Sequence, residues 1–185
     1  MKRLVKKSDV LSTSFSFAQI RQYINEKNPY VLFGLDLDEQ QKLSVILDSF
    51  ENAVKEAASY SKLGMPNLEV GSVDMNILAY YLPGSNTLTI NADKLDELFS
   101  ATIDYIDMIG VHEYGHYVDE KLGDISQTSN WTSVLQNVDI NYLDGYDVTE
   151  STNENAENFA NAFVALSWGA QQDSCTEFIE QALFQ

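Results

Sequence analysis

The sequence predicts an α+β fold that is mostly helical and contains one small sheet. Apolar residues recur at helical spacing in several long segments, whereas a single stretch between Leu68 and Ile90 alternates like strands on either side of a turn. The chain has 185 residues, of which 44% are hydrophobic, so it is long enough to bury a core. We therefore expect one domain over residues 1–185, with a helical N-terminal part at 1–64 and a second part at 65–185.

The N-terminal part contains two predicted helices. The first shows a short amphipathic pattern that ends near Asn28-Pro29 and is formed by Phe15, Phe17, Ile20 and Ile24. The second is expected to begin at the N-cap Asp38, with Gln41 completing a capping box, and to end at Gly64. Its apolar face has helical spacing and consists of Leu43, Ile46, Leu47, Phe50, Val54 and Ala57.

The second part begins with a predicted antiparallel hairpin. Two runs rich in strand-forming residues, VDMNILAYYL and TLTIN, flank the turn-forming residues 83–86. Asn91 can then cap a short helix through Leu98. A longer helix is expected over about 101–122, where Gly123 closes it.

The C-terminal third combines a polar loop with further helices. Residues 124–150 are rich in Asp, Ser, Thr and Asn, and we expect a loop there with one short helix around Val134. Helical periodicity resumes near Ser151, and a last helix is expected over roughly 171–183. The sum is a small sheet packed on a mostly helical body.

The chain is strongly acidic, with 28 acidic residues against 11 basic ones and a net charge of −17. This charge repels phosphate backbones and anionic membrane surfaces, so we expect neither nucleic acid nor a membrane as a partner. One alternative uses the charge directly, because an acidic protein could mimic DNA and occupy a basic site on another protein. Spread-out acidity more often serves solubility.

The cysteine content limits the disulfides and metal clusters that the chain can form, and the N-terminal sequence bears on where in the cell the protein is expected. Cys175 is the only cysteine, which excludes an intrachain disulfide and a thiolate metal cluster. The start MKRLVKK resembles the basic region of a signal peptide, but the polar SDVLSTSFSF follows where an apolar run is required. As written, the chain is expected to be cytoplasmic, or secreted if a signal has been removed.

The two histidines of the chain stand four residues apart in the stretch VHEYGHYVDE. On a helix, His112 and His116 share one face and can offer two imidazole nitrogens to one metal ion. Glu113 is rotated by one residue, so its carboxylate would lie beside the ion, where a general base can take a proton from a bound water. The spacing therefore predicts two zinc ligands together with a catalytic base.

The alternative, that both histidines are ordinary core or surface residues, is less favoured by their neighbours. Gly115 costs about 1 kcal/mol in a helix interior relative to alanine, which makes sense if something must approach the backbone closely. Ile109, Val111 and Val118 are expected to bury the helix around the histidines, where an unpaired imidazole pair would be costly.

A catalytic zinc site needs three protein ligands and one open position, so a carboxylate must complete this set. Two glutamates of the helix that begins near Ser151 are candidates. Glu154 already has a role, as the N3 residue of a capping box with Ser151. Glu157 lies one turn further, near the apolar stripe, where an unpaired carboxylate would be penalised. We predict Glu157 as the third ligand, with Asn161 able to hydrogen-bond a ligand from one turn beyond.

At this point the sequence resembles a known family. VHEYGHYVDE followed by AENFANAF is similar to the zinc endopeptidases related to anthrax lethal factor and the Pro-Pro endopeptidases, a branch of the gluzincins. The resemblance covers roughly residues 100–168 and implies a zincin-like fold, with a catalytic part at 65–185. It implies Glu113 as the catalytic base. The zinc ligands that it implies are His112, His116 and Glu157.

Two positions depart from the family pattern. The family places a tyrosine about seven residues before the third ligand to stabilise the oxyanion, but this chain has Glu150 there. Tyr146 is the nearest replacement and Tyr142 the next. Asn161 stands where relatives often have an acidic residue, which affects the tuning of the zinc rather than its ligation. Asp119 follows the pattern, and it either supports the site or faces solvent.

A second family offers a different reading of the same residues. The phage-associated regulatory metalloproteases that cleave repressors also combine HExxH with a helix that resembles the ENFA segment, and their pattern would select Glu154 as the third ligand.

We expect a zinc-dependent endopeptidase that acts on a protein or peptide, held in extended form along the predicted strand at 77–82 or 87–90. A scaffold of this type used only for binding, for instance as an inhibitor, is the alternative from another class.

Overall fold

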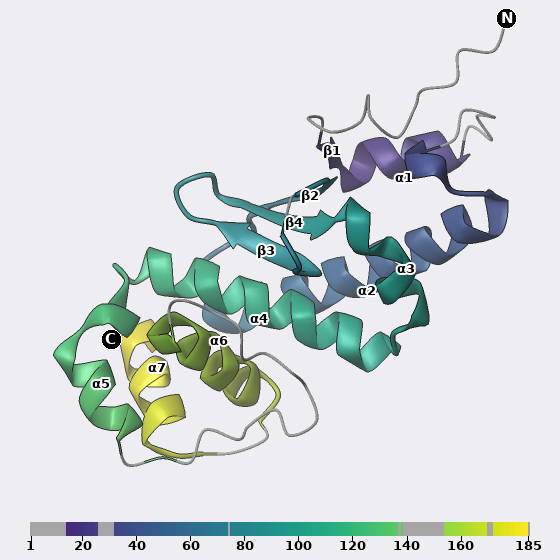
Figure 1. Cartoon of the computed structure of the whole chain (residues 1–185). Coiled ribbons are helices and arrows are strands. Elements are labelled where there is room, and N and C mark those ends of the chain that lie inside the picture. Colours follow the sequence, from purple (N-terminus) through teal and green to yellow (C-terminus); the bar gives the residue numbers. More distant parts are fainter. Residues whose placement is uncertain are drawn as a thin grey trace, which may run out of the picture. The chain divides into compact units, whose positions relative to one another are not determined.

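The computed structural model describes residues 14–25, 32–73, 75–136, 138, 154–169 and 172–184. Within these ranges it contains seven α-helices and a four-stranded sheet, which confirms the predicted α+β class (Figure 1). The helices are α1 (Phe17–Asn25), α2 (Leu37–Ser61), α3 (Leu95–Ser100), α4 (Ile103–Lys121), α5 (Ser129–Leu135), α6 (Glu154–Ser167) and α7 (Ser174–Phe184). The strands are β1 (Phe15–Ser16), β2 (Asn67–Gly71), β3 (Ala79–Leu82) and β4 (Thr87–Asn91).

The chain divides into two compact units, and each unit is made of two separate segments. The first comprises Met1–Ala53 and Pro66–Ile109 and holds the sheet together with α1 and α3. The second comprises Val54–Met65 and Gly110–Gln185 and holds α5, α6 and α7. The long helices α2 and α4 each contribute to both units. The two parts predicted from the sequence, 1–64 and 65–185, are each continuous in sequence. They therefore differ from these units, which both combine residues from before and after position 64.

The sheet of the first unit is mixed, with the strand order β1-β2-β4-β3. Strands β3 and β4 pair antiparallel, with Ala79 opposite Ile90, which confirms the predicted hairpin. Its turn contains Gly84 and Asn86, both with positive φ. Strand β2 pairs parallel with β4, and β1 pairs antiparallel with β2. Strand β3 is thus an edge strand of the described sheet, and it lies in one of the segments where the sequence predicts extended substrate binding.

The N-cap of α2 is Asp36, so the prediction of Asp38 is wrong. The Asp36 carboxylate accepts the backbone N–H of Glu39 at 2.9 Å, and the Glu39 carboxylate accepts the backbone N–H of Asp36 at 2.7 Å. This reciprocal pair is a capping box. Glu39 is a better partner than Gln41 because its negative charge also interacts favourably with the helix N-terminus.

Helix α1 begins at Phe17, and Phe15, which was predicted to be part of that helix, lies in β1 instead. The ring of Phe17 packs edge-on against Phe50 of α2, with ring centroids 6.1 Å apart. The guanidinium of Arg21 pairs with the carboxylate of Glu51 on α2 at 2.6 Å. Both contacts attach α1 to the first half of α2.

The second unit is built around buried helices that confirm the predicted helices of the C-terminal third. In α6, every residue from Phe159 to Leu166 is buried. Trp131 of α5 is fully buried between Phe159 and Phe178, with ring centroids 5.2 and 5.7 Å away. These aromatic contacts bring α5, α6 and α7 together (Figure 1). Among the described helices, none has the length and hydrophobicity needed to cross a bilayer.

Candidate metal centre

Helix α4 carries both histidines and confirms the helix predicted over 101–122. It follows Thr102, whose hydroxyl accepts the N–H of Tyr105 at 3.3 Å. It ends before Gly123, whose φ of +85° is a conformation that glycine adopts at no steric cost. His112 and His116 lie one turn apart on one face, with ring centroids 4.9 Å apart and ring planes nearly perpendicular at 87°.

Gly115 allows α6 to approach α4 more closely than a side chain would permit. A Cβ atom at this position would lie 2.8 Å from Cα of Ala160 and 3.2 Å from its Cβ and its carbonyl oxygen. Cβ atoms in proteins essentially never make contacts under 3.0 Å. The close approach predicted from Gly115 is therefore confirmed, and the approaching segment is the backbone of α6.

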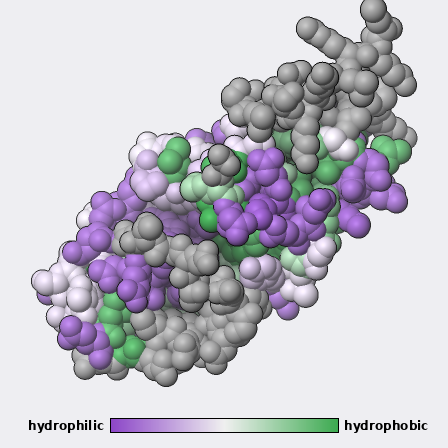
Figure 2. Space-filling model, in the orientation of Figure 1, coloured by the Kyte–Doolittle hydropathy of each residue, from purple (hydrophilic) through white to green (hydrophobic). Residues whose placement is uncertain are grey.

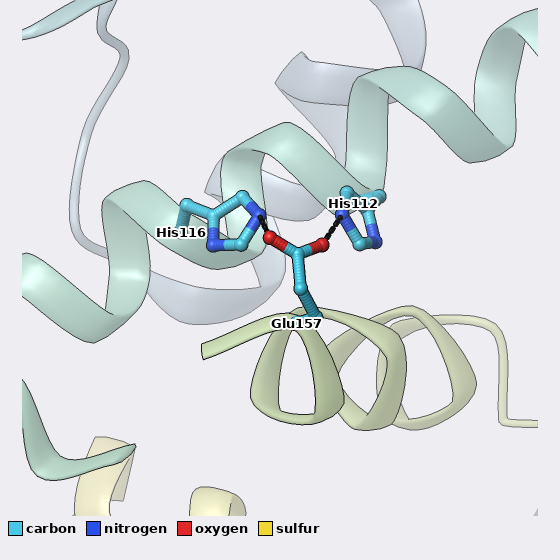
Figure 3. A group of neighbouring side chains, drawn as sticks. All are labelled: His112, His116 and Glu157. Atoms are coloured by element: carbon cyan, nitrogen blue, oxygen red, sulfur yellow. Dashed lines mark hydrogen bonds and ion pairs between the residues drawn. The ribbon is translucent and has the colours of Figure 1, made fainter. Parts of the chain in front are cut away.

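This approach places Glu157 of α6 against both histidines. Its carboxylate lies between the two imidazoles, as Figure 3 shows. Nε2 of His112 is 3.1 Å from Oε2 of Glu157, and Nε2 of His116 is 3.5 Å from Oε1. One ligand atom from each of the three residues can be chosen so that all lie within 4.8 Å of one another. Three side chains from two helices thus converge on one point.

The donor set of this cluster could hold a metal ion, and its ligand types are among those that bind zinc. Two imidazole nitrogens and one carboxylate oxygen leave a fourth position for water or substrate. A tetrahedral ion with bonds of about 2.0–2.1 Å separates its ligand atoms by about 3.3 Å. The two nitrogen–oxygen separations of 3.1 and 3.5 Å bracket that spacing, and all three ligand atoms, including the two nitrogens, lie within 4.8 Å of one another.

The electrostatics of the cluster favour a cation. Burial raises the pKa of Glu157, but hydrogen bonds from His112 and His116 and their charge outweigh it and hold that pKa well below its usual range. Burial lowers the pKa of His116, but the hydrogen bond with Glu157 and nearby negative charge outweigh it and raise that pKa above its usual value. The carboxylates that supply this charge are Glu113, Glu157 and Asp119.

Asn161 contacts the cluster from the next turn of α6. Its Oδ1 lies 2.8 Å from Nδ1 of His112, on the other side of the ring from Glu157. Both side chains of this pair are buried. The predicted hydrogen bond between Asn161 and a candidate ligand is therefore confirmed, and the residue it holds is His112.

Asp119 is buried, so the interpretation that it faces solvent is wrong. Its carboxylate accepts the backbone N–H of Ser126 at 2.9 Å and the Ser126 hydroxyl at 2.5 Å. Burial raises the pKa of Asp119, although the Ser126 hydrogen bonds oppose that shift. These bonds attach the 3-10 helix Ile125–Gln127 to the end of α4. That short helix in turn contacts α6, so Asp119 supports both helices of the cluster.

Of the remaining predicted site residues, the structure describes two. Glu113 is buried beside His112 on α4. Glu154 is exposed in the first turn of α6 and does not join the cluster. The predicted oxyanion donor Tyr146, its substitute Tyr142 and the capping residue Ser151 lie outside the described residues.

Three aromatic residues position the site in ways that the sequence patterns did not indicate. The hydroxyls of Tyr114 and Tyr117 donate to the carbonyl oxygens of Gly64 and Leu63, each at 2.9 Å, and so hold the segment that follows α2 against α4. The indole N–H of Trp131 donates to the carbonyl oxygen of residue 155 at 3.1 Å, two residues before Glu157. A buried tyrosine or tryptophan needs a partner for its polar group, but the sequence does not say which partner.

Comparison with known proteins adds no identification. No protein-family model matches the chain, and neither the curated proteins nor the solved structures give a significant match. The resemblance to the lethal factor branch of the gluzincins therefore stays a prediction, and the geometry of the cluster carries the functional argument.

Proposed function

We propose that this chain is a zinc-dependent endopeptidase with a zincin-like fold, in which His112, His116 and Glu157 hold the ion. The observation that carries the proposal is the convergence of these side chains within 4.8 Å, although His112 and Glu157 are 45 residues apart in sequence. Among the residues that the structure describes, three such ligands come together, which is the pattern of a catalytic zinc site, because structural zinc sites are closed by a fourth protein ligand. Helix packing at Gly115 supports the same assignment, since it brings the two helices into contact beside the cluster.

In the proposed reaction, the zinc ion and the side chains have different roles. When bound, zinc would supply a Lewis acid for the scissile carbonyl and a water whose pKa is lowered to about 7. The Glu113 carboxylate accepts a proton from the attacking water and passes it to the amine as the C–N bond breaks. The products are a carboxylic acid and an amine, and Glu113 returns to its ionised form. Tyr146 stays the predicted donor to the oxyanion.

Cleavage of a peptide library tests the activity. Wild-type protein loaded with zinc should cleave, whereas Glu113→Gln should lower kcat by at least about 100-fold with little change in bound zinc. Glu120→Gln, on the same helix, is the matched control and should keep wild-type activity. Chelation should abolish cleavage. Cleavage that survives both Glu113→Gln and chelation would refute the proposed mechanism, and tight zinc binding without any cleavage would favour a binding protein.

A pair of variants tests the third ligand separately. Glu157→Ala should weaken zinc affinity by at least about 100-fold, because it removes the negative ligand. Glu154→Ala should leave affinity unchanged, since that side chain is exposed. The measurement is competition for zinc with a chelating dye. Loss of zinc only on Glu154→Ala would instead support the pattern of the phage-associated regulatory metalloproteases.

A further inference from the structure

The imidazole of His112 lies between two oxygen atoms. Its Nδ1 is 2.8 Å from Oδ1 of Asn161, and its Nε2 is 3.1 Å from Oε2 of Glu157. His112 is 6% exposed and Asn161 is 7% exposed, so solvent offers few alternative partners. A neutral imidazole carries only one N–H. It therefore cannot donate to both oxygens at once, and the position of its proton must depend on what binds at Nε2.

Two arrangements of a neutral His112 imidazole give both of its ring nitrogens a partner. With a cation at Nε2 of His112, the imidazole proton belongs on Nδ1, where Oδ1 of Asn161 accepts it. Without a cation, the Glu157 carboxylate needs a donor at Nε2, and Nδ1 then becomes an acceptor. A half-turn of the Asn161 carboxamide places its NH2 group beside Nδ1 and supplies that donor.

The carboxamide is the group that permits both arrangements. An amide offers an acceptor at one end and a donor at the other, whereas an ionised carboxylate only accepts hydrogen bonds. A carboxylate at position 161 can only accept a hydrogen bond, so it would keep a proton on Nδ1 of His112 with or without a cation, and the zinc-free ring would then lie between two carboxylates. It would also add negative charge to a site where Glu113, Glu157 and Asp119 already act on His116.

We propose that Asn161 is a positioning residue that lets His112 exchange tautomers as the metal binds or leaves. On binding, the proton on Nε2 passes to water and one is taken up at Nδ1, so the imidazole keeps a single proton and stays neutral. At the same time the Asn161 carboxamide rotates by half a turn, so that it accepts rather than donates the hydrogen bond at Nδ1 of His112. This inference rests on the proposed zinc site and adds a role for the amide, which orients a ligand without adding charge.

Nitrogen NMR of the imidazoles tests this directly, because the chain contains only two histidines. Protein labelled with 15N in histidine is compared with and without zinc at about pH 9, well above the usual histidine pKa of about 6.5. The wild type should carry the His112 proton on Nε2 without zinc and on Nδ1 with zinc. The same Nδ1–H tautomer in both states, or a doubly protonated His112 without zinc, would overturn the proposal.

Variants separate this role from simple packing. Asn161→Asp should keep a proton on Nδ1 of His112 in both states, and an Nδ1 that is unprotonated in the zinc-free variant would also overturn the proposal. Asn161→Leu should weaken zinc affinity by about 10- to 100-fold. Asn155→Leu, whose side chain points roughly 160° away from Glu157 around α6, is the matched control and should show neither effect. Failure of the wild type to bind zinc would overturn the zinc site itself, whereas binding without tautomer exchange would overturn only the role of Asn161.

Discussion

At the scale of single residues, partners decide what a buried carboxylate does. Asp119 is buried and Glu157 is half-buried, yet their pKa values move in opposite directions. Glu157 is hydrogen-bonded by two imidazoles that can carry positive charge, so its pKa falls. Asp119 is hydrogen-bonded mainly by the neutral Ser126, which does not overcome its burial, so its pKa rises. The first environment suits a ligand of a cation, and the second suits a structural acceptor.

Asp119→Ala should therefore destabilise the fold. It would leave the buried N–H and hydroxyl of Ser126 without their acceptor, and we expect a loss of about 3 kcal/mol in the free energy of unfolding. Asp119→Asn keeps one acceptor and should lose less. Urea unfolding of the zinc-free protein measures both, with Glu120→Ala as the control on the same helix. Equal losses for Asp119→Ala and Glu120→Ala would contradict this role.

Tyr114 should titrate later than an ordinary tyrosine. Burial raises its pKa to about 12, with a smaller contribution from Tyr117 and an opposing one from the Ser61 hydrogen bond. The folded pKa lies above the unfolded value of about 10, so the stability linked to this proton is present below pH 10 and is lost as pH rises toward 12. Absorbance at alkaline pH should show one tyrosine ionising with unfolding. Tyr114→Phe should show a shallower loss of stability over this range, and an identical loss would refute the assignment.

At the scale of elements, local patterns predict helices well and their contacts poorly. The hairpin, α4 and α6 follow from periodicity and turn residues. Asp38 is followed three residues later by Gln41 and Asp36 by Glu39, so the local sequence permits a capping box at either position, and the reciprocal bonds between Asp36 and Glu39 decide between them. The apolar spacing that includes Phe15 indicates a helix, whereas the pairing of Phe15 with β2 depends on a strand more than 50 residues away, which no local pattern contains.

The site shows the same limit. Helical spacing predicts that His112 and His116 share one face, and the structure places Glu157 in their cluster, whereas Glu154 is exposed. The burial of Asp119 depends on how the chain turns after α4, and no local pattern specifies that turn. Gly115 was predicted in part. Its cost in a helix indicates that another segment approaches closely, but it does not identify that segment as Ala160 of α6.

Gly115→Ala tests that helix contact. Alanine would gain about 1 kcal/mol from helix propensity, but overpacking against the backbone of Ala160 should cost more, and we expect a net loss of about 2 kcal/mol. Zinc affinity should also fall, because α6 carries Glu157. Adding Ala160→Gly should rescue little, since the nearest atom to the new Cβ is Cα of residue 160. Increased stability with unchanged zinc affinity would contradict the close approach.

At the scale of the whole molecule, charge is distributed unevenly along the chain. No lysine or arginine follows Lys121, whereas acidic residues recur as far as Glu180. The segment after Lys121 belongs to the unit that holds the proposed metal centre. Hydrophilic residues cover much of the described surface on the face shown in Figure 2. The excess of acidic residues creates a negative electrostatic field, which should attract cationic peptides and repel anionic ones.

Salt should therefore affect cleavage of cationic substrates selectively. The Debye length falls from about 30 Å at 0.01 M salt to about 10 Å at 0.1 M, so screening should lower kcat/KM for a lysine-rich peptide several-fold over that range. A peptide with glutamine in place of lysine should change little, and kcat should be nearly constant for both because the field acts on encounter. Zinc content measured at each salt concentration controls for loss of the ion. Equal salt dependence for the two peptides would show that the net charge of −17 does not steer substrates to the site.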